Sequence, residues 1–186
     1  MSFDLASAQA DMRRAYYGGA AGMAAAAAAW TAAATVALRG TVDAAIWTLL
    51  VAGMFIHPAG MLLSRIAGRP GAHARGNPLA GLAGAGTFWL IFSLPLAYAA
   101  SRLQLAWFFP AMLLVIGGRY LTFDTLFGNR LYWGCGLALA AAGFLLGRAL
   151  AAPALAAFAG AAIEAIFALT IALRERRAAG ALANAA

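Results

Sequence analysis

Four side chains in the apolar stretches of this 186-residue chain have the chemistry to hold a charge or carry a proton. Arg119, Tyr120 and Asp124 lie at the end of one apolar run, and Glu164 is the only acid inside any apolar run. An ionisable group in hydrocarbon is costly unless it is paired or hydrated, so it marks a candidate functional site. Because the arginine stem is long, Arg119 can reach Glu164 if their two segments are neighbours.

A fifth ionisable side chain is His57, which stands before a proline in another apolar run. Histidine titrates near neutral pH, which suits a proton relay or a ligand contact; the simpler interpretation is a neutral ring bonded to a backbone carbonyl. In the functional interpretation, Glu164, Arg119 and His57 line a polar cavity that opens to the cytoplasm and binds a small solute or a proton. Tyr120 and Asp124 extend this site towards water.

The alternative interpretation gives the same residues structural roles. Arg119 then reaches the lipid headgroups and pairs locally with Asp124 or with a terminal acid. Glu164 is protonated and bonds to a carbonyl oxygen, to Thr31 or to Thr48. A cavity that reaches Glu164 would favour the functional interpretation, and a dry bundle would favour the structural one.

The elements that must position these residues are apolar helices. Hydrophobic residues make up 65% of the chain and charged residues 10%, against about 25% charged residues in soluble domains. The apolar residues fall in blocks of about 20, the length that crosses ~30 Å of hydrocarbon. We therefore predict an all-α polytopic membrane protein with six transmembrane helices, at 17–38, 44–63, 79–100, from Leu105, at 131–147 and at 154–173.

The distribution of the 13 arginines predicts the orientation of these helices. Arg39, Arg102 and Arg148 fall on one side and the other ten on the opposite side, which the positive-inside rule places in the cytoplasm together with both termini. Residues 1–16 then form a cytoplasmic segment with an interfacial helix, 17–173 the transmembrane domain and 174–186 a cytoplasmic tail. Heavy use of Ala, Gly and Arg without Lys indicates a bacterium, and so its inner membrane.

Two cytoplasmic corners share the dipeptide Gly-Asn, which ends at Asn77 and at Asn129. Several further identities recur at the same 52-residue offset, which suggests that spans 2–3 and 4–5 are parallel copies of one helical hairpin. Both residues of the dipeptide tolerate positive φ, so a turn is expected at each corner. Arg75 and its neighbours in the first of these loops are candidates for contact with phospholipid, and they lack the spacing of a phosphate-binding loop.

Other classes of function find little support. Cys135 is the only cysteine, so neither a disulfide nor a metal site can be built from thiols, and we expect no metal and no cofactor. Paired aspartates, HExxH and GxSxG are absent, which argues against an enzyme. The chain carries a net charge of +7, but its arginines lie between apolar blocks, so nucleic acid is not an expected partner.

The motifs HPAG from His57, GNPL from Gly76, TFW from Thr87 and FFPAMLLVIGGRYLTF from Phe108 together resemble a family of small, six-span bacterial inner-membrane proteins of unknown function. The resemblance covers nearly the whole chain. It implies the topology described above, and it implies no activity.

Two functions remain on these grounds. The first is a small-solute or ion transporter or channel with a polar site around Glu164, Arg119 and His57. The second is a structural or accessory membrane subunit that packs against a partner or lipid and transports nothing. The expected partners are the lipid bilayer, a small solute or ion, and a second copy of the chain.

Overall fold

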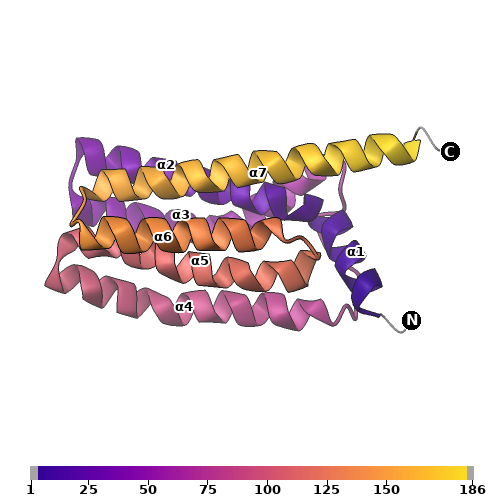
Figure 1. The fold of residues 1–186 in the computed structure, drawn as a ribbon, viewed down its shortest axis with the longest axis horizontal. Helices are drawn as coiled ribbons and strands as arrows, with labels where there is room; N and C mark the ends of the chain where they lie inside the picture. The colour runs from indigo at the N-terminus through magenta and orange to yellow at the C-terminus, as the bar shows by residue number, and fades with distance from the viewer. Residues whose placement is uncertain (1–3, 184–186) are drawn as a thin grey trace.

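The computed structural model describes residues 4–183, which form a bundle of long helices (Figure 1). A short helix α1 (Leu5–Tyr16) and a 3-10 turn η1 (Tyr17–Gly19) lead into the bundle. The remaining elements are α2 (Ala20–Arg39), α3 (Val42–Ile66), α4 (Leu79–Leu103), the turn η2 (Leu105–Trp107), α5 (Phe108–Phe127), α6 (Leu131–Arg148) and α7 (Pro153–Ala183). Within the described residues, six helices are long and apolar enough to cross a membrane, which confirms the predicted all-α membrane fold.

The helix boundaries follow from local sequence signals. Thr41 caps α3, since its hydroxyl accepts a hydrogen bond from the amide of Ala44 at 3.2 Å. Gly128 ends α5 with a positive φ of 60°, and its N–H bonds to the carbonyl of Asp124. α7 continues as a helix through Ala183, beyond residue 173 where the predicted span ended.

The two ends of the bundle differ. α1, the loop 67–78 and the turn 128–130 lie at one end, which we call the α1 end, and the links 40–41, 104–107 and 149–152 lie at the other, the distal end (Figure 1). α2 packs along α3 and α7, α6 packs along α5 and touches α7, and α4 packs chiefly on α5. α4 is therefore an edge helix, with most of its side chains exposed.

Small residues set the closest helix contact. A Cβ atom placed on Gly136 of α6 would lie 2.6 Å from the backbone oxygen of Gly117 on α5. No real side chain fits there, so the two glycines let the backbones of α5 and α6 touch. This close pairing fixes the faces that α5 turns towards α4 and towards α7.

α1 closes the bundle at its own end. Its N-cap is Asp4, and hydrogen bonding by Ser7 holds the pKa of Asp4 below its ordinary value of 3.8. Gln9 donates to the carbonyl of Thr125 at 2.8 Å, and Arg13 donates to that of Phe127 at 2.6 Å. These carbonyls belong to the last turn of α5 and have no partner within their own helix, so α1 caps α5 from outside.

The turn between α1 and α2 requires an unusual backbone. Tyr17, Gly18 and Gly19 all have positive φ, which glycine adopts freely and tyrosine rarely does. Contacts hold Tyr17 in place: its hydroxyl donates to the carbonyl of Ala172 and accepts from Arg176, at 3.2 and 3.1 Å. The start of α2 is thus tied to the end of α7.

The predicted Gly-Asn corners share one local structure. The side-chain oxygen of Asn77 accepts the amide of Leu79 at 3.0 Å, and that of Asn129 accepts the amide of Leu131 at 3.1 Å. The helices that follow, α4 and α6, begin in the same way. The packing is not shared, since α5 and α6 pack along each other while α3 packs on α2 and has few close contacts with α4. The duplication of whole hairpins stays a prediction.

Candidate functional site

The carboxyl group of Glu164 lies at the centre of the bundle and is 0% exposed. Its Oε2 accepts a hydrogen bond from the hydroxyl of Tyr120 on α5 at 3.0 Å. Its Oε1 accepts one from the indole nitrogen of Trp30 on α2 at 3.3 Å. Three helices therefore meet at one carboxyl group, and each of its oxygens has an uncharged donor.

Local packing puts the two donors in place. A Cβ atom on Gly160, one turn before Glu164, would lie 2.9 Å from the indole of Trp30, so glycine makes room for the ring against α7. Phe109 packs against the same indole, with ring centroids 6.1 Å apart. The indole is thereby held with its N–H towards the carboxyl group.

Aromatic rings connect this site to the α1 end. The ring of Tyr120 packs against Phe123 and Tyr132 at centroid distances of 5.1 and 5.9 Å. The hydroxyl of Tyr132 donates to the carbonyl of Gly18 at 2.7 Å. The site is therefore covered on this side by packed rings and by the turn between α1 and α2.

Arg119 points to a different part of the molecule from its neighbour Tyr120. Its guanidinium lies against α4, where Nη2 donates to the hydroxyl of Thr87 at 3.4 Å, and over the ring of Phe123 at 5.3 Å. Its Nε is buried and has no acceptor among the described residues. The predicted contact between Arg119 and Glu164 is not formed, since the one ion pair within residues 4–183 joins Arg14 to Asp11.

The other residues singled out from the sequence do not join this site. His57 is exposed on α3. Asp124 is partly buried near the end of α5, and its backbone carbonyl accepts the N–H of Gly128. Arg75 is exposed in the loop 67–78. Glu164 and Tyr120 are thus brought together, while His57, Arg119 and Asp124 lie elsewhere.

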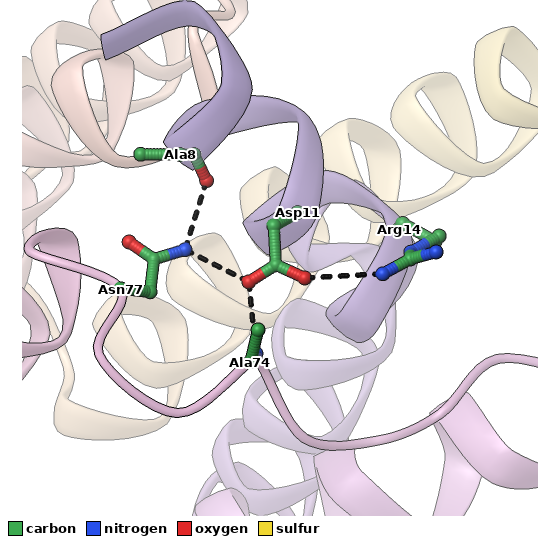
Figure 2. Close-up of polar contacts among 5 residues, drawn as sticks. All are labelled: Ala8, Asp11, Arg14, Ala74 and Asn77. Carbon is green, nitrogen blue, oxygen red and sulfur yellow. Dashed lines mark hydrogen bonds and ion pairs between the residues drawn. The ribbon is translucent and has the colours of Figure 1, made fainter. Parts of the chain in front are cut away.

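Asn77 belongs to a separate polar network at the α1 end (Figure 2). Its amide nitrogen donates to the carbonyl of Ala8 at 3.0 Å and to Oδ2 of Asp11 at 2.8 Å. The same Oδ2 accepts the amide of Ala74 at 2.9 Å, and Oδ1 of Asp11 accepts from Arg14 at 3.3 Å. These bonds fasten the loop 67–78 to α1, so Asn77 has a structural role here beyond its own turn.

Two hollows on the surface of the bundle are shallow and lie away from Glu164. One of about 360 Å³ lies near the distal end between α4, α5 and α6, beside Trp107, Pro110 and Phe144. Another of about 550 Å³ follows the outer face of α3 at Trp47 and Val51. No group of three or more His, Cys, Asp or Glu side chains gathers to hold a metal ion within residues 4–183.

Comparison with known families identifies the chain. A family model described as a family of unknown function, DUF7010, matches residues 5–174. The chain belongs to DUF7010. This confirms the predicted membership of an uncharacterised family, and the six apolar helices show that this DUF7010 protein is an integral membrane protein. No curated protein and no solved structure matches the chain.

Trp30 is the member of the site in this DUF7010 protein that sequence reasoning missed. It stands alone in an alanine-rich segment, a pattern that predicts a side chain used for packing only. The signal available was its N–H group, because a buried indole nitrogen usually finds an acceptor. Glu164, as the only acid inside an apolar run, was the acceptor to consider.

Proposed function

We propose that this protein is a permease for a small solute or ion, and that the carboxyl group of Glu164 is its proton- or cation-binding site. The observation that carries the proposal is a carboxyl group with 0% exposure that is held by uncharged donors from two other helices. Ionisable residues inside membranes most often mark ion or proton pathways.

The donor set suits a group that changes its charge. The hydroxyl of Tyr120 can donate to a carboxylate and can accept from a carboxylic acid, while Trp30 donates in both states. No fixed cation neutralises Glu164, since Arg119 forms no ion pair with it within residues 4–183. A proton or a bound cation is therefore free to supply the missing charge.

The conformation described corresponds to a closed step in such a cycle. Glu164 has no solvent-exposed surface, so a solute must enter through a transient separation of helices. The solute could enter between α6 and α7, because these two helices contact each other less than α5 contacts α6 or α2 contacts α7. Tyr132 of α6 packs against Tyr120 of the site, and Tyr132 and Cys135 of the same helix are both buried and uncharged.

The test is proton flux into liposomes that contain the purified protein and a trapped pH-sensitive dye, driven by a potassium gradient with valinomycin. Glu164→Gln keeps the size of the side chain and removes its titration, so the flux should fall at least about tenfold, as for loss of an essential proton-transfer group. Asp43→Asn, at an exposed acid of α3, is the matched control and should leave the flux unchanged. Equal flux in wild type and Glu164→Gln would rule the proposal out.

The second candidate is a structural or accessory subunit that packs against a partner or lipid. The complete burial of Glu164 and the shallow surface hollows favour it. In that case the hydrogen bonds from Trp30 and Tyr120 to Glu164 hold α2, α5 and α7 together. Glu164→Gln would then change the stability of the protein, and wild-type liposomes would carry no more protons than empty ones.

A further inference from the structure

Arg119 is a charged side chain in the membrane-spanning part of α5 that the site at Glu164 does not use. Within residues 4–183 it pairs with no acid. Its polar contacts are one long hydrogen bond to Thr87 and the face of Phe123, and its Nε has no acceptor. A guanidinium has five N–H donors, so most of its hydrogen-bonding capacity is unused.

The surroundings of this guanidinium open towards lipid. Thr87 is exposed, and the hydrogen bond that it accepts lies at the surface between α4 and α5. Gly86 of α4 packs beside Arg119, since a Cβ atom built on it would lie 3.6 Å from Nε. A Cβ atom built on Gly81 or Gly84, further along α4 towards the α1 end, would meet nothing within 4 Å, so the surface of α4 is open there. Towards the middle of the membrane, the flanking side chains Ile91 and Leu114 are apolar and exposed.

We propose that Arg119 binds the phosphate group of a phospholipid that lies between α4 and α5 in the leaflet at the α1 end, and that Thr87, whose hydroxyl donates to the carbonyl of Ala83 and accepts from Arg119, holds the guanidinium in position. The guanidinium supplies parallel N–H donors that match phosphate oxygens, and phosphate supplies the missing negative charge. The acyl chains run along Ile91 and Leu114, and the headgroup occupies the space over Gly81 and Gly84. A free anion would lack the apolar contacts, which is why a lipid is the occupant.

The test is a titration of the purified protein in detergent with phosphatidylglycerol, with the bound lipid counted by native mass spectrometry. Wild type should hold one lipid more tightly than any further ones. Arg119→Gln should weaken this first affinity by at least about tenfold, the usual effect of losing a hydrogen bond to a charged group. Arg130→Gln, at an exposed arginine at the start of α6, should change it less than about twofold, as expected of a solvated charge.

Further titrations show whether the bound molecule is a phospholipid. Diacylglycerol with the same chains should bind about tenfold more weakly than phosphatidylglycerol, because it lacks the charged acceptor. Excess inorganic phosphate should not displace the lipid. Thr87→Val keeps the charge and the shape of the surface and should weaken binding by about threefold, as for loss of one weak hydrogen bond. Its thermal unfolding temperature should match wild type, which keeps the test valid if Arg119→Gln folds poorly.

Three results would overturn the proposal: equal first-lipid affinity in wild type, Thr87→Val and any folded Arg119 variant; equal affinity for diacylglycerol; or displacement of the lipid by inorganic phosphate. The last would indicate a site for a soluble anion. None of these results bears on proton flux through Glu164, so the two proposals stand or fall separately.

Discussion

At the scale of single residues, the central feature is that two residues adjacent in sequence contact different helices. Arg119 and Tyr120 are adjacent on α5, and successive residues of an α-helix point about 100° apart. Tyr120 faces α7 and reaches Glu164, and Arg119 faces α4 and reaches Thr87. One helix thus places a neutral donor in the core and a cation towards lipid.

The sequence identified Glu164 and Tyr120 as site residues because ionisable and hydroxyl groups stand out in apolar runs. It could not pair them correctly. The rotation of α5 about its axis decides whether Arg119 or Tyr120 meets Glu164, and that rotation depends on close packing at Gly117 and Gly136. Hydropathy carries little information about this rotation, since apolar residues lie on every side of the helix.

A residue-scale prediction concerns the bond between Tyr120 and Glu164. Tyr120→Phe removes a donor from a buried carboxyl group and should lower the free energy of unfolding by about 1–3 kcal/mol. The coupling energy with Glu164→Gln should exceed about 0.5 kcal/mol, because the two side chains are in direct contact. Unfolding in mixed micelles with increasing dodecyl sulfate measures both. Additive effects of the two substitutions would show that the bond does not contribute.

At the scale of elements, α1 is fastened to segments far away in the sequence. It bonds to the end of α5 through Gln9 and Arg13, and to the loop 67–78 through Asp11 and Asn77. An amphipathic segment at this position could be predicted from its pattern of apolar residues. The residues that α1 contacts could not be predicted, because the sequence assigned Asn77 only to its own turn and gave no sign that its amide bonds to α1.

The element-scale prediction uses the two equivalent corners. Asn77→Ala removes the two buried hydrogen bonds that its amide donates to Ala8 and Asp11, at a cost of about 1–3 kcal/mol. Amide hydrogen exchange across α1 should therefore accelerate by about tenfold or more. Asn129→Ala removes the matching turn bond to Leu131 and touches no residue of α1 through its hydrogen bonds, so it is the control. Equal exchange in both variants would contradict the proposed role of Asn77.

At the scale of the whole molecule, the number of helices could be predicted and their arrangement could not. Each crossing needs about 20 apolar residues, so segment length alone fixes the count. When apolar residues lie on every side of a helix, the sequence does not show which face packs against which neighbouring helix. The position of α4 at the edge, with few contacts to α3, therefore emerges only from the packed structure.

The orientation of the bundle is a prediction at this scale. The excess of arginine at the α1 end predicts that this end lies in the cytoplasm. Cysteine introduced at the distal end as Gln104→Cys should react with a membrane-impermeant maleimide on intact cells. Ala72→Cys, in the loop 67–78, should react only after the membranes are broken. The native Cys135 is 0% exposed and gives no background; the reverse labelling pattern would invert the topology.

The docking of α1 has a consequence for the order of assembly. α1 is synthesised before α5, and Gln9 bonds to a carbonyl that comes 116 residues later. Until the ribosome has delivered α5, that partner does not exist, and α1 cannot complete its contacts. α1 therefore reaches its final place only after the chain up to the end of α5 has been made, and its docking reports that the last turn of α5 is in position.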